Sequence, residues 1–155
     1  MTTSFSLVEI IFCAGAICGT IDFAAAMAFS ASRGVPPQRA LRAIASAAIG
    51  PGAFERSGAA ALGLALHFVI AFSVAAVYVC ASRWLPALNQ YPVTSGILYG
   101  ICVHLVMTFI VLPLSALKRP FSMTFFLGQL LIHAFCVGLP IALVTHYFYL
   151  HSSTP

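Results

Sequence analysis

Four ionisable side chains stand inside long apolar stretches of the chain, each in a different stretch. They are one aspartate and three histidines, Asp22, His67, His104 and His133. A carboxylate inside a membrane helix is costly, by at least about 2.5 kcal/mol on membrane-insertion scales. Ionisable residues in such helices face the interior of a helix assembly and mark proton, ion or substrate paths. These four residues are therefore the candidate functional centre.

Three kinds of chemistry fit one carboxylate among three imidazoles. The first is structural, with interhelical hydrogen bonds of about 0.6 kcal/mol each that fix the helix register. The second is transport or proton handling, with Asp22 as proton carrier or counter-charge and the imidazoles as its partners. The third is a metal site, because His and Asp bind zinc and iron, or a haem held by paired histidines. Each ligand would then come from a separate helix, and we expect no cofactor by default.

Motifs of enzymes and of nucleic-acid-binding proteins are missing from the sequence. It contains no G-x-S-x-G, no phosphate-binding loop and no calcium-binding loop, and no nucleophile stands beside a base. The five cysteines lie in apolar segments without C-x-x-C spacing. No patch combines aromatic and basic residues. We therefore expect neither an enzyme nor a nucleic-acid partner.

The composition requires a lipid solvent. Of the 155 residues, 61% are hydrophobic and 6% are charged, and the mean hydropathy is +1.04. Soluble domains carry about 25% charged residues. The length accommodates about four spans of 20–25 residues and no separate soluble domain. We predict an all-α integral membrane protein, a single membrane domain over 1–155 built as a four-helix bundle, with transmembrane helices over about 7–32, 59–82, 93–117 and 122–150.

A short amphipathic helix is predicted over about 37–49, between the first two spans. Pro37 suits a first helical turn. One face carries Leu41 and neighbouring apolar residues, and the other carries Arg39 and Arg42. We expect this helix at the membrane interface, with the arginines among lipid head groups; the alternative is a loop helix packed on the ends of the spans. Lys118 and Arg119 are further candidates for head-group contacts.

Small residues accompany the ionisable ones on the same helix faces. Glycines at i−3 or i−4 allow another helix to approach closely, either within the chain or in a homo-oligomer or larger complex. Thr108 follows His104 by one turn, and Gln129 precedes His133 by one turn, so both join the expected polar cluster. The glycines expected at helix contacts are Gly15, Gly19, Gly63, Gly96 and Gly100.

Basic residues predict the orientation in the membrane. The first and third loops hold six of the seven Lys and Arg residues, and the second loop holds only Arg83. The positive-inside rule then places both termini on the outer side. Counted from the cytoplasmic ends at about 1.5 Å per residue, the four ionisable residues lie about 12 to 18 Å deep, near one plane. His146 and His151, near the outer end, are expected to be solvated.

From His67 onward, the chain resembles the YagU-like bacterial inner-membrane proteins. The resemblance implies a multi-pass protein of the bacterial cytoplasmic (inner) membrane and supplies no mechanism. Two features depart from the family pattern: the turn after Pro86 is longer, and the family histidine falls nearer Thr108 than His104, which argues against a fixed metal site. The matching residues are His67, Phe72-Ser73, Tyr78, Pro86, Gly96-x-x-x-Gly100 and Pro113.

The functional prediction is a small polytopic membrane protein of unidentified substrate, transporter-like or proton-linked through the Asp and His cluster. The alternative is a non-catalytic accessory or scaffold subunit, in which the same residues only hold helices together. A haem- or metal-binding membrane protein is the second alternative, with His67, His104, His133 and Asp22 as ligands.

Overall fold

The computed structural model describes residues 5–117 and 120–152. All regular elements of this part are helical, and four runs are long and apolar enough to cross a membrane. The predicted all-α chain with four candidate spans is therefore confirmed. Lys118 and Arg119 lie outside the described residues. The four runs are Leu7–Ser32, Ala59–Ser82, Pro92–Leu114 and Met123–His151.

Two of these runs are single helices and two are composite. The first span is α1 (Leu7–Ser32) and the second is α3 (Ala59–Ser82). The third consists of α5 (Pro92–Val106), the π-helical turn η2 (Met107–Val111) and α6 (Leu112–Leu114). The fourth consists of α7 (Met123–Ile132), the π-helical turn η3 (His133–Gly138) and α8 (Leu139–His151). The connections contain α2 (Pro37–Ile49), the 3₁₀ turn η1 (Pro51–Phe54) and α4 (Ala87–Gln90).

Local signals set the ends of the first two spans. α1 begins with a capping box, in which Ser6 Oγ accepts from Glu9 N at 3.2 Å and Glu9 Oε2 accepts from Ser6 N at 2.7 Å. Gly34 follows α1 with a φ of +72°, and Gly58 precedes α3 with a φ of +80°. L-residues with side chains rarely adopt such angles, so glycine permits both turns.

A proline follows each π-helical turn. Pro113 comes two residues after η2, and Pro140 comes two residues after η3. A proline has no N–H to donate, and its ring crowds the carbonyl one turn earlier. A wider turn relieves this crowding, which accounts for a π segment at this place in both spans. Such turns are frequent at functional sites.

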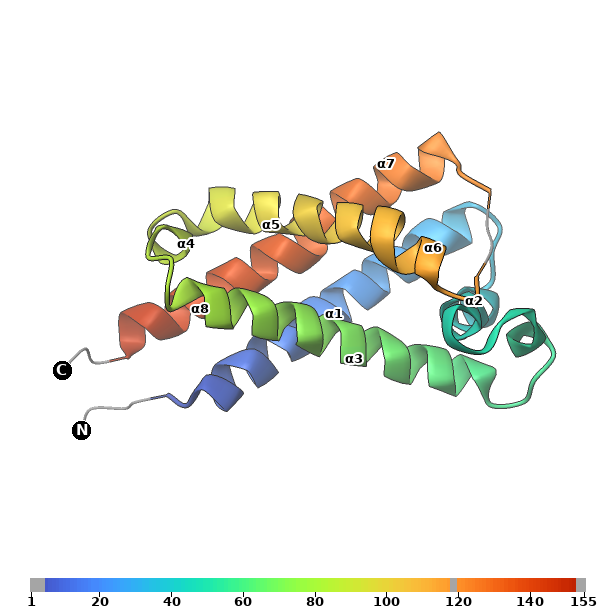
Figure 1. The fold of residues 1–155 in the computed structure, drawn as a ribbon, viewed down its shortest axis with the longest axis horizontal. Helices are drawn as coiled ribbons and strands as arrows, with labels where there is room; N and C mark the ends of the chain where they lie inside the picture. Colours follow the sequence, from blue (N-terminus) through green and yellow to red (C-terminus); the bar gives the residue numbers. More distant parts are fainter. Residues whose placement is uncertain (1–4, 118–119, 153–155) are drawn as a thin grey trace.

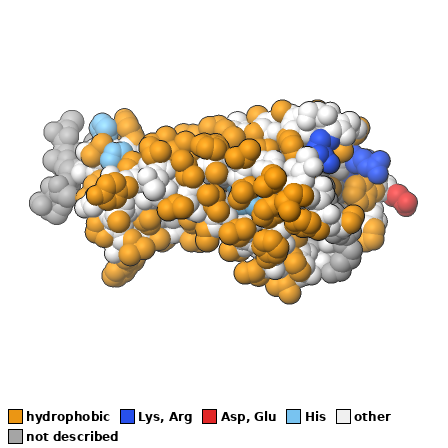
Figure 2. Space-filling model, turned by 90° about the horizontal axis from the view of Figure 1, so that it is seen from above, with side chains coloured by type: hydrophobic (Ala, Val, Ile, Leu, Met, Phe, Trp, Pro, Cys, Tyr) orange, Lys and Arg blue, Asp and Glu red, His pale blue; other side chains and the backbone are white. Residues whose placement is uncertain are grey.

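The four spans lie side by side, with both termini at one end of the molecule and α2 at the other (Figure 1). α1 packs between α3 and the fourth span, and the fourth span packs in turn against α5. The third span also meets α3, where Tyr99 donates its hydroxyl to the Val74 carbonyl at 2.7 Å. On the face seen in Figure 2, hydrophobic side chains cover most of the length of the molecule, and the visible Lys and Arg side chains lie at the α2 end.

Glycines bring the backbones of the third and fourth spans together. A Cβ added at Gly138 would overlap the Gly96 carbonyl, and one added at Gly100 would overlap the His133 carbonyl. Between α1 and α3, Gly15 and Gly19 lie against phenylalanine rings of α3. The absence of side chains at these glycines therefore sets the distances between the helices that carry the ionisable residues.

The short helix α2 is docked on the end of α3. A Cβ at Gly63 would overlap the Leu41 carbonyl, so Gly63 accommodates α2 and not another span. Ala47 O also accepts from Ala116 N at 2.9 Å, which ties α2 to the end of the third span. Arg42 donates to the Phe54 carbonyl at 2.9 Å. This arrangement matches the alternative of a loop helix packed on the span ends, and lipid contacts of Arg39 and Arg42 remain a prediction.

Candidate functional site

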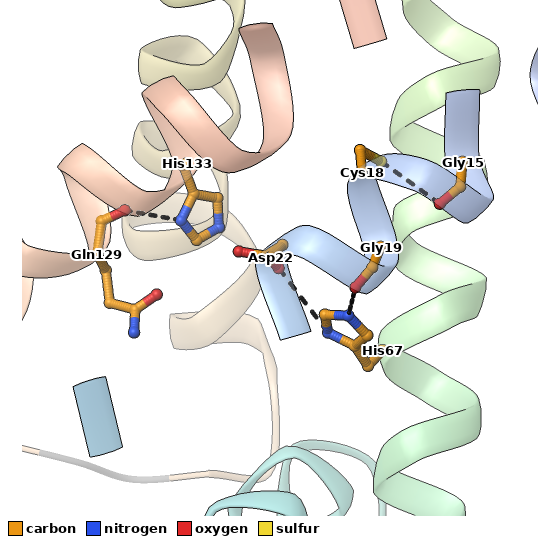
Figure 3. A network of polar contacts seen from close by, with 7 residues as sticks. All are labelled: Gly15, Cys18, Gly19, Asp22, His67, Gln129 and His133. Atoms are coloured by element: carbon orange, nitrogen blue, oxygen red, sulfur yellow. Dashed lines mark hydrogen bonds and ion pairs between the residues drawn. The ribbon is translucent and has the colours of Figure 1, made fainter. Parts of the chain in front are cut away.

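Asp22 on α1 and His67 on α3 form the centre of the site. His67 Nδ1 lies 3.9 Å from Asp22 Oδ2, and the two side chains are 11% and 15% exposed. His67 Nε2 lies 2.9 Å from the Gly19 carbonyl oxygen, one turn before Asp22 on the same helix. Figure 3 shows the imidazole bridging these two groups. A single side chain of α3 therefore contacts both the backbone and the carboxylate of α1.

The Gly19 carbonyl fixes where the His67 proton resides. A carbonyl only accepts, so Nε2 carries the proton that it donates. In a neutral imidazole, Nδ1 then has a lone pair, and this lone pair is directed at the Asp22 carboxylate. The two groups attract only when one further proton is bound, either on Nδ1 of His67 or on the carboxylate.

His133 repeats this arrangement on the other side of Asp22. Its Nδ1 lies 2.8 Å from the Gln129 carbonyl oxygen of its own span and donates to it. Figure 3 shows the His133 ring directed toward the Asp22 carboxylate. His133 Nε2 can likewise donate to Asp22 only when the ring carries a second proton.

His104 extends the row into the third span. Its ring centroid lies 5.1 Å from that of His133 and 4.8 Å from that of Phe126. The side chain is buried, at 3% exposure, and its Nε2 has no hydrogen-bond partner within the part of the chain that the structure describes. Burial of a polar atom without a partner is unfavourable, so a hydrogen-bond donor or acceptor brought to His104 Nε2 would be stabilised.

The four residues lie in the same order as the helices that carry them. His67 on α3 is followed by Asp22 on α1, His133 on the fourth span and His104 on the third. The row therefore runs across the molecule from helix to helix, and we call it the polar row. At its centre, Asp22 Oδ1 is buried and has no hydrogen-bond partner among the described residues.

The side chains of Gln129 and Thr108, both expected in the cluster, make no hydrogen bond to the polar row among the described residues. The Gln129 side chain extends away from Asp22 (Figure 3), and only its backbone carbonyl contacts His133. Thr108 lies in η2, one turn beyond His104, and none of the hydrogen bonds of the described residues joins it to the polar row. The backbone carbonyls of Gly19 and Gln129 are the hydrogen-bond partners of His67 and His133 instead. Because every residue has a backbone carbonyl, the sequence could not indicate these two.

The described residues contain no group of three or more His, Cys, Asp or Glu side chains arranged to hold a metal ion. The rings of His104 and His133 are in direct contact, which leaves no room for a haem between them. The metal and haem alternatives therefore remain predictions, and we derive no step through either.

The opposite end of the fourth span departs from expectation. His146, predicted to be solvated, is half-buried, and its Nδ1 lies 2.7 Å from the Asn89 carbonyl oxygen. His151 is exposed, as expected. The turn after Pro86 folds into α4 and thereby brings the Asn89 carbonyl to His146.

Comparisons with known proteins add no relative to this description. The resemblance to YagU-like proteins therefore remains an expectation. No protein-family model, no curated protein and no solved structure matches this chain.

Proposed function

We propose that this is a multi-pass membrane protein that binds a proton at Asp22 and uses it in proton-linked transport. The observation that carries the proposal is that Asp22 lies between two imidazoles that each already donate to a backbone carbonyl. His67 donates one N–H to the Gly19 carbonyl, and His133 donates one N–H to the Gln129 carbonyl. Each can therefore attract Asp22 only if an additional proton is bound, and this supports proton binding at the polar row.

The direction of the polar row favours coupled transport over a passive proton channel. The row runs from helix to helix and does not run along the helices, so it does not by itself connect the two ends of the molecule. A proton at Asp22 needs a helix movement to reach either membrane surface. The π-helical turns η2 and η3, beside His104 and His133, supply wide turns where such a movement could occur.

The proposed setting is the bacterial inner membrane, with both termini on the outer side. The apolar flanks and the basic α2 end support it (Figure 2).

An infrared titration of the protein in lipid nanodiscs tests the proposal. The wild type should show one titrating signal, from the Asp22 carboxyl or from a partner imidazolium, that is lost in Asp22→Asn. Glu9→Gln is the matched control, because it alters another carboxylate of α1 and retains the capping box. If Asp22→Asn leaves every titrating signal unchanged, Asp22 binds no functional proton and the proposal fails.

The accessory or scaffold function is the second candidate. The observation that favours it is the bond from His67 Nε2 to the Gly19 carbonyl, which ties α3 to α1 whatever the protonation of Asp22. Under this alternative, Asp22→Asn would retain both the fold and the cellular phenotype. Proton-driven uptake in liposomes, lost in Asp22→Asn and retained in Glu9→Gln, would contradict it.

A further inference from the structure

A second site lies at the end of the molecule that carries both termini. There, a cavity of about 460 Å³ opens between the start of α1, the end of α3, α4 and the end of α8. Leu7, Ile10 and Val79 contribute an apolar wall, and Arg83, Asn89 and Thr145 contribute polar groups. Figure 1 shows these elements converging near the termini, far from α2. No member of the polar row lines this cavity.

Asn89 makes hydrogen bonds to Ser82 and His146, and its side-chain oxygen Oδ1 has no partner among the described residues. Its side-chain Nδ2 donates to the Ser82 carbonyl at 3.1 Å, and its backbone carbonyl accepts from His146 Nδ1 at 2.7 Å. The residue is 4% exposed, and its Oδ1 has no hydrogen-bond partner in the described part of the chain. A buried amide oxygen without a donor is unfavourable. A ligand that brings an N–H or O–H group to it would therefore be stabilised.

Arg83 supplies an unpaired positive charge on the same cavity. It is exposed, and no hydrogen bond or ion pair of its side chain to another described residue occurs. It lies at the end of an apolar span, next to Trp84, which is also exposed. Arg and Trp at a span end are typical of the membrane interface, where lipid phosphates lie. The guanidinium can bind such a phosphate through two N–H groups.

We propose that this cavity binds a phospholipid whose head group carries a hydrogen-bond donor. The phosphate lies at Arg83, the ammonium or hydroxyl of the head group donates to Asn89 Oδ1, and an acyl chain lies along Leu7, Ile10 and Val79. Phosphatidylethanolamine and phosphatidylglycerol both meet this description. Phosphatidylcholine has the same phosphate, but its trimethylammonium group has no N–H. The proposal requires membrane insertion and is independent of proton binding at Asp22.

Lipid competition tests the proposal on the full-length protein. The protein is equilibrated in detergent with equal amounts of the three lipids, and the bound lipid is identified by native mass spectrometry. We expect phosphatidylethanolamine or phosphatidylglycerol to be retained over phosphatidylcholine by about tenfold, because choline leaves the buried Asn89 Oδ1 without a hydrogen-bond donor. The ratio of the first two tells which donor is preferred. Equal retention of all three lipids, or no retained lipid, would overturn the proposal.

Two variants separate the phosphate contact from the donor contact. Arg83→Gln should weaken binding of all three lipids alike and retain the order of preference. Asn89→Ala should abolish the preference. Arg56→Gln, an exposed arginine in the loop beyond α2, is the matched control and should change neither. If Arg83→Gln binds as the wild type does, the phosphate does not lie at Arg83 and the proposal fails, whether or not Asn89→Ala folds.

Discussion

Substitution of Gly100 by alanine should damage both the stability of the protein and the polar row. Gly100 on α5 faces η3, where a Cβ would overlap the His133 carbonyl oxygen and lie 2.7 Å from Ala134 Cα. All of these neighbours are backbone, so no side-chain rotation relieves the overlap. The third and fourth spans must separate instead, and His133 moves with its backbone.

The size of the effect follows from the contact distance. Non-bonded carbon atoms pack at about 3.5–4.0 Å, so relief of a 2.7 Å contact requires the two spans to separate by about 1 Å. Overpacking of a close-packed interior costs about 1–3 kcal/mol. We expect Gly100→Ala to lower the free energy of unfolding by about 2 kcal/mol. The same displacement should change the titrating signal of Asp22, because His133 lies beside the carboxylate.

Unfolding in mixed detergent micelles, followed by circular dichroism, measures the loss of stability. Gly52→Ala is the control, because a Cβ at Gly52 meets nothing within 4 Å and the φ there is not positive. It should change the free energy of unfolding by less than about 0.5 kcal/mol. If Gly100→Ala were also within about 0.5 kcal/mol of the wild type, the close contact between α5 and η3 would not exist as described, and the reasoning would be refuted.

Three further substitutions test individual contacts by thermal unfolding. Asp22→Asn should be nearly neutral, within about 1 kcal/mol, because an amide can donate to the lone pair of a neutral imidazole; a loss above about 3 kcal/mol would instead indicate a broken buried ion pair. His67→Leu should cost about 1 kcal/mol, since it removes the hydrogen bond from His67 Nε2 to the Gly19 carbonyl, and wild-type stability would contradict that bond. Ser6→Ala should cost about 1 kcal/mol by removal of the cap of α1, and no change would mean that the capping box does not contribute.

Sequence signals were sufficient for the spans because those signals are local. The apolar run over 7–32 ends at a Gly that can adopt positive φ, and the run over 59–82 begins after another. The π-helical turns were not predicted, although Pro113 and Pro140 mark their places. A proline indicates a kink in a helix, but whether the turn widens depends on the neighbouring span.

The four ionisable residues of the polar row could be singled out from the sequence, but their order and the backbone carbonyls of Gly19 and Gln129 could not. Depth along a helix follows from counting residues, and this placed Asp22 and the three histidines near one level. Which imidazoles flank Asp22 depends on which helices are neighbours, and residue spacing within one helix does not contain that information. The amphipathic pattern of α2 has the same limit, because an apolar face can meet lipid or α3 equally well.

The central place of Asp22 gives the proposed proton binding a structural consequence. A proton shared between Asp22 and His67 strengthens the contact of α1 with α3, and a proton shared between Asp22 and His133 strengthens its contact with the fourth span. Interhelical hydrogen bonds in membranes contribute about 0.6 kcal/mol on average and about 1.7 at most. Movement of the proton from one side to the other therefore shifts a helix equilibrium by about threefold to twentyfold. Such a shift biases two arrangements without locking either one, so complete switching requires a second ligand that also prefers one arrangement.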